Sequence, residues 1–226
     1  MSLRDFWDEN ADVWARFART PHHDREHELV NLPSFLELLP PPGRATLDLG
    51  CGEGRIGAEL VRRGHTVVGV DSSPRMVELA RELHDAVVAD AAALPFGDAA
   101  FDLVVAYMSL MNFDDLDGAV AEAARVLEPG GRLCASVVHP IVAAANHESP
   151  NHVAPERLVL ERYYDGPTKV WESDRDGIHM TFHDRPFPLS GYFGALERAG
   201  LAVDALREPS PDGRLPLFLQ LRALKR

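Results

Sequence analysis

Three glycines lie close together in the segment Asp48-Leu49-Gly50-Cys51-Gly52-Glu53-Gly54. This spacing lets the backbone turn sharply and approach a ligand without interference from a Cβ atom. A helix is expected directly after the loop, and the free N–H groups of its first turn suit an anionic ligand. Taken alone, the segment is also compatible with a strand-to-helix turn that merely requires glycine.

Three aspartates stand at the ends of consecutive apolar runs. Asp48 lies inside an apolar strand end, where a carboxylate is costly to bury unless a cation or several donors satisfy it, so a ligand with an ammonium group suits it. Asp71 ends the second run, and Asp90 ends the third, where it offers an acceptor to an exocyclic amine. Taken singly, Asp71 and Asp90 are each equally compatible with a solvated acid at the end of a strand. Together, beyond a glycine loop, they predict a ligand site.

A dinucleotide site is the competing interpretation of the same loop. Gly52, Gly54 and Gly57 have the spacing of the dinucleotide fingerprint, and Asp71 lies at a suitable distance to bind a ribose. A nicotinamide-dependent oxidoreductase therefore stays open at this point. Asp48 favours a ligand that carries an ammonium group over a dinucleotide, because a pyrophosphate gains nothing from a buried carboxylate. Asp90 adds an acceptor for an exocyclic amine at the same edge of the sheet.

Two histidines are candidate general bases, since imidazole titrates near neutral pH. His139 directly follows an expected strand in Val-Val-His-Pro, and His183 lies in the stretch His179-Met-Thr-Phe-His183-Asp-Arg185-Pro. Either can equally be a structural histidine that hydrogen-bonds the backbone. No metal is expected from His22, His23 and His27. His23 and His27 are four residues apart on a possible helix, but no third ligand for this pair is evident nearby. The acids at 114, 115 and 117 are explained by a solvated helix start.

Short apolar runs alternate with helical patterns between residues 45 and 138, which predicts a doubly wound, mostly parallel α/β sheet. The expected strands are 45–50, 66–71, 86–90, 101–107 and 132–138. The first helix spans about 55–63 and ends before Gly64, and a second begins at Ser73-Pro74 and places Met76, Val77, Ala80 and Leu83 on one face. A third carries apolar residues from Leu116 to Leu127 and is closed by Pro129-Gly130-Gly131.

The flanking segments differ from this core. Residues 3–39 predict two helices that include Trp7, Trp14 and Phe17, and residues 139–188 break the rhythm with possible strands at 157–164 and 178–183. A helix over 190–199 and strands near 202–207 and 216–223 follow. We therefore expect one domain over 1–226, with a helical lid (1–40), a cofactor-binding core (41–138), an acceptor-side cap (139–188) and a C-terminal helix and strands (189–226).

The composition is that of a globular protein, with 46% hydrophobic residues and a formal net charge of −12. An acidic chain repels phosphate backbones, so a nucleic-acid substrate is disfavoured. Two cysteines form no disulfide framework, the first residues do not form a signal peptide, and no run approaches the ~18 apolar residues of a membrane span. We expect a soluble, cytoplasmic protein without a membrane or nucleic-acid partner, either a monomer or a homodimer.

The runs LDLGCGEG, VVGVD, ADAAALPF, FDLVVAY and RVLEPGGRL occur in this order between residues 45 and 138. This ordered set resembles the class I S-adenosylmethionine-dependent methyltransferases. The resemblance implies a Rossmann-like sheet of seven strands with an antiparallel final strand near 216–223. It also implies S-adenosylmethionine as the cofactor and methyl transfer to a small-molecule acceptor as the activity.

The resemblance also implies roles for single positions. Gly50, Cys51, Gly52 and Gly54 would form the loop around the methionine part of the cofactor, with Asp48 on its ammonium side. Asp71, next to Ser72, would accept both ribose hydroxyls. Asp90 would face the adenine amine. The remaining expected cofactor contacts are Ala91, Ala92, Met76 and Leu94 around the adenine, Ala106, Tyr107 and Met108 near the sulfonium, and Trp14 as a lid residue.

Methyl transfer from a sulfonium needs alignment and exclusion of water more than it needs many catalytic groups. An oxygen acceptor requires a base when its pKa lies well above 7, whereas an amine need only arrive neutral. We expect an oxygen or nitrogen acceptor from specialised metabolism, with His139 and His183 as candidate bases. A family member that binds the cofactor without transferring a methyl group is a further alternative. The aromatic residues of the cap form either the acceptor pocket or the cap's own core: Tyr163, Tyr164, Trp171, Phe182, Phe187 and Tyr192.

Overall fold

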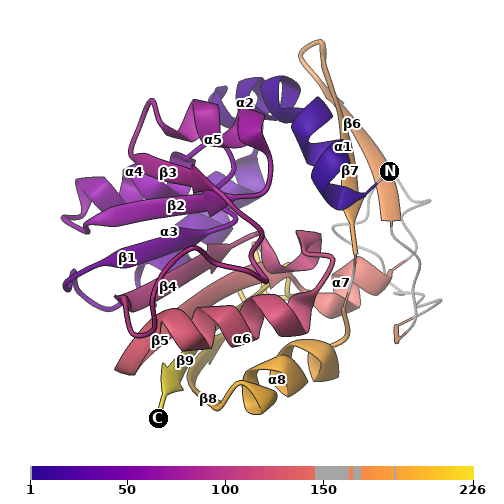
Figure 1. The fold of residues 1–226 in the computed structure, drawn as a ribbon. Coiled ribbons are helices and arrows are strands. Elements are labelled where there is room, and N and C mark those ends of the chain that lie inside the picture. Colours follow the sequence, from indigo (N-terminus) through magenta and orange to yellow (C-terminus); the bar gives the residue numbers. More distant parts are fainter. Residues whose placement is uncertain (1, 146–162, 165–168, 186) are drawn as a thin grey trace.

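The computed structural model describes residues 2–145, 163–164, 169–185 and 187–226. Its main sheet has seven strands in the order β3-β2-β1-β4-β5-β9-β8 (Figure 1). All neighbouring pairs are parallel except those that involve β9, which runs antiparallel to β5 and β8. The predicted doubly wound, mostly parallel sheet with an antiparallel final strand is therefore confirmed. The strands are β1 (Thr46–Leu49), β2 (Val67–Asp71), β3 (Asp85–Val88), β4 (Phe101–Tyr107), β5 (Leu127–Val138), β8 (Leu201–Arg207) and β9 (Phe218–Lys225).

Helices cover both faces of the sheet. Figure 1 shows α6 (Leu116–Val126) and α8 (Leu189–Arg198) on one side, and α4 (Arg55–Arg62) and α5 (Pro74–Ala80) on the other. The central strands are apolar on both faces because both are covered, and all four residues of β1 are buried. The largest buried cluster joins β1, β4 and β5 to α6 and α8.

Local sequence signals explain several helix ends. Gly64 follows α4 with φ +92°, as the left-handed position predicts, and the Ser73 hydroxyl caps α5 by accepting from the Met76 N–H at 3.0 Å. Two predictions were wrong in detail. Helix α5 ends at Ala80, so Leu83 lies beyond it and is exposed. The turn Pro129-Gly130-Gly131 does not close α6, because β5 already begins at Leu127.

The N-terminal segment forms three α-helices and not the two that the sequence predicted. They are α1 (Leu3–Glu9), α2 (Ala11–Arg19) and α3 (Leu32–Leu36), and a π-helical turn at His27–Asn31 precedes α3. Helices α1 and α2 pack on α5 through a cluster that includes Ala11, Ala15, Met76 and Leu79. A π turn widens the helix by one residue and is frequent at functional sites.

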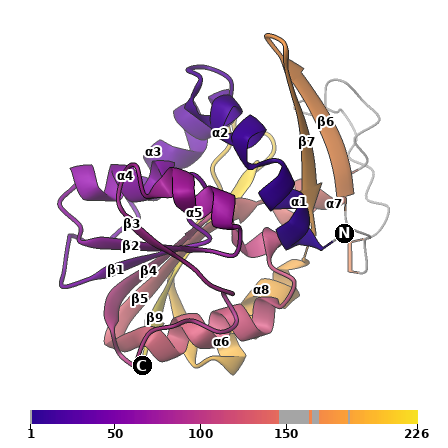
Figure 2. The ribbon, with the colours of Figure 1, turned by 45° about the horizontal axis from the view of Figure 1, so that its top comes forward.

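The cap segment contains a separate two-stranded antiparallel sheet, β6 (Lys169–Arg175) and β7 (Ile178–Asp184). The strand expected at 178–183 is confirmed. The strand expected at 157–164 lies outside the described residues, apart from Tyr163 and Tyr164, which form a turn. Figure 2 shows the β6–β7 hairpin standing beside α1 and α2. Ile178 and Met180 of β7 pack against Phe17 of α2, so the hairpin and the N-terminal helices share one hydrophobic cluster.

Two shorter helices complete the described chain. A 3-10 turn, η2 (Leu110–Asn112), follows β4, and α7 (Pro140–Ala144) follows β5. Within the part of the chain that has assigned positions, no helix combines the length and the apolar character that a membrane span requires.

Candidate functional site

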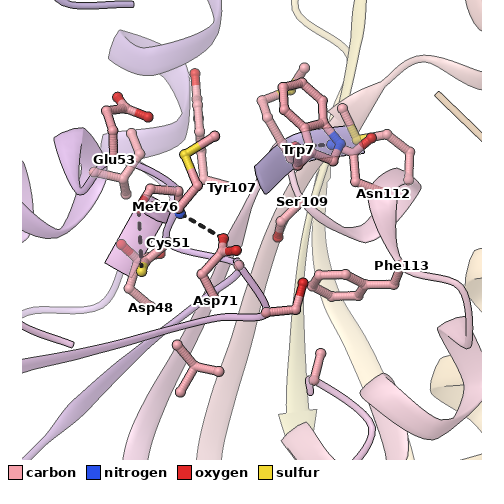
Figure 3. Close-up of a pocket in the computed structure, with 18 of the residues that line it drawn as sticks. Trp7, Asp48, Cys51, Glu53, Asp71, Met76, Tyr107, Ser109, Asn112 and Phe113 are labelled. Atoms are coloured by element: carbon pink, nitrogen blue, oxygen red, sulfur yellow. Dashed lines mark hydrogen bonds between the residues drawn. The ribbon is translucent and has the colours of Figure 1, made fainter. Parts of the chain in front are cut away.

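A cavity of about 540 Å³ lies at the carboxyl ends of β1, β2 and β4, the edge where ligands bind in doubly wound sheets. The N-terminal helices cover it from above. Figure 3 shows the labelled residues around it, with Asp48, Cys51 and Glu53 toward one end and Trp7, Asn112 and Phe113 toward the other. The sequence predicted twelve of its lining residues: Trp14, Asp48, Gly50, Cys51, Gly52, Asp71, Ser72, Met76, Asp90, Ala91, Tyr107 and Met108.

The glycine loop has the backbone conformation that its sequence predicts. Gly50, Gly52 and Gly54 all have positive φ, at +73°, +54° and +92°. A Cβ on Gly50 would lie 2.5 Å from the Ser109 Cβ, and one on Gly54 would lie 2.9 Å from the Ala80 backbone. A side chain at either position would therefore be strained and would collide with its neighbours.

Asp71 organises the loop between β1 and α4. One carboxylate oxygen accepts from the Gly52 N–H at 2.9 Å, and the other accepts from the Ser73 N–H at 2.9 Å. Burial raises the pKa of Asp71, while these backbone bonds oppose the rise. Each carboxylate oxygen has room for a second donor. Asp71 is thus fixed in orientation and still able to accept two hydroxyls.

Two other carboxylates lie beside the loop. Asp48 and Glu53 are 1% and 2% exposed, and one oxygen of each (Oδ2 and Oε1) has no hydrogen-bond partner among the described residues. Burial raises the pKa of Asp48 to about 7, and the negative charges of Glu53 and Asp71 add to the rise. Arg55 Nε lies 3.6 Å from Glu53 Oε1, beyond hydrogen-bond distance. Two buried carboxylates, each with an oxygen that accepts no hydrogen bond, fit an ammonium group, which supplies both charge and donors. This end of the cavity therefore suits the amino-acid tail of S-adenosylmethionine.

The N-terminal lid is attached directly to the glycine loop. Trp14 Nε1 donates to Glu53 Oε2 at 2.7 Å, and the Arg55 guanidinium lies 5.0 Å from the Trp14 ring centroid. Arg19 donates to the Glu53 carbonyl at 3.1 Å, and Arg55 pairs with Asp24 at 3.1 Å. The structure therefore places Trp14 over the loop, where the sequence expected a lid residue.

A second set of lid residues lines the cavity and was missed by sequence reasoning. His27 and Asn31 lie on the π turn, and His27 Nδ1 is 2.8 Å from the Tyr107 hydroxyl. Burial lowers the pKa of His27 to about 4, and Arg55 adds to this effect, so the imidazole is neutral at pH 7. Their spacing of four residues is the only signal in the sequence, and it does not reveal that the turn lies against β4.

The adenine side of the expected site is only partly as predicted. Asp90 and Ala91 line the cavity, and an Asp90 oxygen accepts from the Ala92 N–H at 2.9 Å. Four expected contacts do not line it: Gly54, Ala92, Leu94 and Ala106. Gly54 caps α4 with its backbone, Ala106 is fully buried inside β4, and Leu94 is buried in the core with its N–H bonded to Glu122. Val88 and Ala89, which the sequence did not predict, also line the cavity.

The opposite end of the cavity was not anticipated from the sequence. Its wall contains Trp7 of α1 and the turn after β4, from Ser109 to Phe113. Ser109 donates to the Leu49 carbonyl at 2.7 Å, which ties this turn to β1. Asp114 and Asp115 also line the cavity, and Asp115 caps α6 by accepting from the Gly118 N–H, as the sequence predicted for a helix start.

The two candidate bases lie outside the residues that line the cavity. His139 is 1% exposed, accepts from the Ile141 N–H through Nδ1 at 3.2 Å, and has Nε2 2.9 Å from Glu208. Burial lowers its pKa, and the Glu208 contact opposes the change. His183 stacks on Phe6 with ring centroids 4.5 Å apart. Among residues with assigned positions, no group of three His, Cys, Asp or Glu is arranged to hold a metal ion.

Comparison with known proteins is consistent with this geometry. Residues 47–135 match the family described as methyltransferase domain. GfsG, a methyltransferase of Streptomyces halstedii, is 43% identical over 101 residues, which cover 40% of this chain and 36% of that protein. The O-methyltransferase cnsE of Penicillium expansum is 36% identical over 138 residues, which cover 57% of this chain and 46% of that protein. The chain thus spans less than half the length of these two relatives.

A solved structure confirms the fold. An S-adenosylmethionine-dependent methyltransferase from Mesorhizobium loti superposes with a TM-score of 0.65 at 24% identity, covering 85% of this chain and 96% of that one. Residues 47–135 are therefore similar to the methyltransferase-domain family, and the described chain has the fold of S-adenosylmethionine-dependent methyltransferases. This similarity favours S-adenosylmethionine as the cofactor over the nicotinamide interpretation of the glycine loop.

Proposed function

We propose that this protein transfers the methyl group of S-adenosylmethionine to an oxygen or nitrogen of a small-molecule acceptor. One observation carries the proposal. The cavity holds Asp48 and Glu53 at one end, Asp71 at the glycine loop and Asp90 in the loop after β3, all among its lining residues. In this order, the carboxylates suit the amino-acid tail, the ribose and the purine amine of the cofactor.

In this proposal the residues divide the cofactor among them. Asp48 and Glu53 hold the ammonium group, Asp71 accepts the two ribose hydroxyls, and Asp90 with the Ala91 N–H meets the adenine edge. Met76 is 2% exposed and lines the cavity, which suits an apolar contact with the ring. When bound, the cofactor supplies an electrophilic methyl group on a sulfonium.

The protein's own contribution is alignment and exclusion of water. Trp14 and Trp7 close the cavity from the lid, and Tyr107 and Met108 stand where β4 ends. Met108 has φ +55°, an uncommon conformation for a residue with a side chain, and its N–H is held by the Ser136 carbonyl at 2.7 Å. Backbone strain of this kind is characteristic of functional positions.

A general base remains a prediction. The hydrogen bonds of His139 and the stacking of His183 favour positioning roles for both histidines. If the acceptor is an amine that arrives neutral, no base is required. The name of the Penicillium relative supports oxygen as the accepting atom. Location in the cytoplasm, a role in specialised metabolism and the absence of a nucleic-acid partner belong to the same proposal. The net charge of −12 supports the last of these.

Calorimetry tests the cofactor part of the proposal. S-adenosylhomocysteine should bind at micromolar concentration, and NADH should not bind. Incubation with methyl-labelled S-adenosylmethionine and a panel of small hydroxylated and amino compounds then tests transfer. If S-adenosylhomocysteine does not bind, the proposal fails. If it binds and no compound is ever labelled, the result favours a family member that does not transfer methyl groups.

A further inference from the structure

Beside the proposed cofactor site, away from Asp48 and Glu53, the cavity wall contains aromatic and apolar side chains. Met111 and Phe113 come from the turn after β4, and the Trp7 indole comes from α1. Met111 is buried and Phe113 is half-buried. Flat aromatic side chains favour a flat partner, because offset stacking and edge contacts need planar surfaces.

Two polar atoms in this wall lack partners. Trp7 Nε1, a donor, and Asn112 Oδ1, an acceptor, are buried and make no hydrogen bond to any residue that the structure describes. The orientation of the Asn112 amide is set by its own nitrogen, which donates to the Met108 carbonyl at 3.3 Å. A buried polar group without a partner costs free energy, which a ligand recovers by supplying the missing bond.

One strand holds both parts of this wall in place. His183 of β7 stacks on Phe6, the residue before Trp7. Arg185, just after β7, donates its N–H to the Met111 carbonyl at 3.1 Å and its guanidinium to the Asp114 carbonyl at 3.0 Å. The hairpin therefore sets the position of Trp7 relative to Asn112. This explains why His183 belongs to the site without lining the cavity.

The charge of the cavity limits what can bind beside the cofactor. Of the lining residues within the described parts of the chain, seven are Asp or Glu and two are Arg. One of the two, Arg55, is already paired with Asp24. An anionic acceptor would meet like charges in a partly desolvated site and is disfavoured.

We infer that Trp7 Nε1 and Asn112 Oδ1 together recognise a hydroxyl group on a planar, uncharged acceptor of the phenol or enol type. The hydroxyl oxygen accepts a hydrogen bond from the Trp7 N–H, and the hydroxyl O–H donates a hydrogen bond to the Asn112 side-chain oxygen. A hydroxyl satisfies both atoms at once, whereas a carboxylate offers no donor and an ether offers no proton. This inference rests on the proposed function, because it assigns the acceptor end of the same site.

The experiment uses the full chain saturated with S-adenosylhomocysteine and measures binding of three probes by calorimetry. The probes are 2-naphthol, 2-methoxynaphthalene, which lacks the O–H donor, and 2-naphthoate, which is anionic. We expect 2-naphthol to bind roughly three- to tenfold more tightly than the methyl ether, the usual effect of one hydrogen bond. 2-Naphthoate should bind more weakly than either.

Variants connect the probes to the two residues. Trp7→Phe keeps an aromatic ring and removes the N–H, so it should weaken both 2-naphthol and its methyl ether by roughly three- to tenfold. Asn112→Leu should weaken 2-naphthol to a similar degree and leave the ether unchanged, because the ether donates nothing to Asn112. Tyr164→Phe, which removes a hydroxyl from a side chain that is 77% exposed, is the control and should change neither.

The outcomes separate this inference from the proposed function. If S-adenosylhomocysteine binds but no probe does, or if 2-naphthol and its ether bind alike, the inference is wrong and the proposed function stands. Unchanged 2-naphthol affinity in Trp7→Phe also overturns it. Should Asn112→Leu lose S-adenosylhomocysteine affinity, the probe comparison on the unaltered chain and on Trp7→Phe still decides. Failure of S-adenosylhomocysteine to bind the unaltered chain would instead remove the proposed function.

Discussion

Trp14 of the lid and Glu53 of the glycine loop are joined by a hydrogen bond of 2.7 Å between the indole Nε1 and the carboxylate Oε2. The other oxygen of Glu53 is buried and makes no hydrogen bond within the described structure, although Arg55 Nε lies 3.6 Å away. Glu53 is therefore oriented by the lid and held in position for a donor from a ligand. In the proposed function, the lid therefore completes the cofactor site in addition to covering it.

Replacing Trp14 with Phe tests this relationship. The substitution keeps a ring over the loop and removes the N–H, so Glu53 loses the bond that orients it. We expect the affinity for S-adenosylhomocysteine to fall roughly three- to tenfold. Calorimetry measures the change, with Tyr164→Phe as the matched control. An affinity equal to that of the unaltered protein would show that the contact is not part of the site.

Asp71→Asn should have a larger effect on cofactor binding. An amide carries one acceptor oxygen in place of two, so it cannot accept from both the Gly52 and Ser73 N–H groups, and it loses the charge that strengthens bonds to the ribose. Loss of charged hydrogen bonds predicts roughly a ten- to hundredfold weaker affinity for S-adenosylhomocysteine. Asp85→Asn, an exposed acid at the start of β3, is the control and should bind normally. Equal affinities in the two variants would contradict the ribose role.

Two buried groups should give the free energy of unfolding opposite pH dependences. The pKa of Asp48 is raised from 3.8 to about 7, so the unfolded chain ionises first and Asp48 lowers stability as pH rises from about 4 to 7. The pKa of His27 is lowered from 6.5 to about 4, so His27 lowers stability as pH falls through the same range. Each contributes about 1.4 kcal/mol per pH unit between its two pKa values.

Denaturant titrations of the protein without cofactor separate the two groups. Asp48→Asn removes the first dependence, so its stability should rise steadily from pH 4 to 6.5. His27→Gln removes the second, so its stability should fall over the same range. Parallel pH profiles for the two variants would contradict the assignment.

Cofactor affinity should itself depend on pH through Asp48. An ammonium group binds the ionised carboxylate, so below pH 7 binding must release a proton from Asp48. We expect S-adenosylhomocysteine to bind more tightly as pH rises from 6 to 8, approaching a tenfold change per unit well below the pKa of Asp48. In Asp48→Asn this dependence should disappear. Calorimetry in buffers of different ionisation enthalpy measures the released proton, and its absence would contradict the ammonium assignment.

His139→Gln should reduce stability without removing a catalytic group. The side chain is buried and holds both the start of α7 and the segment after β8 through Ile141 and Glu208. Loss of these bonds predicts a destabilisation of about 1–3 kcal/mol. Once an acceptor is found, the methyl-transfer rate per folded molecule and its pH profile should be unchanged. A lost rate with normal stability would restore His139 as the base.

Much of the fold was predictable because its signals are local. The strand ends at Leu49, Asp71 and Tyr107 lie where the apolar runs end, and the glycine loop needs positive φ at the positions where glycine stands. Burial on both faces produces continuous apolar runs, which a sequence shows directly. Element boundaries were less accurate: β3 ends at Val88 and not at residue 90, so Asp90 lies in the loop beyond the strand.

The sequence by itself determined the class of fold and the loop with its three aspartates, since each depends on neighbours within a few residues. Only the tertiary structure brought Trp7, His27, Asn31 and Asn112 together in the wall of one cavity. These contacts join segments far apart in the chain, such as the 80 residues between His27 and Tyr107, and arise from packing that no local pattern encodes. The part of the cavity wall that contains Trp7 and Asn112 is therefore a product of how the lid and the hairpin pack on the sheet.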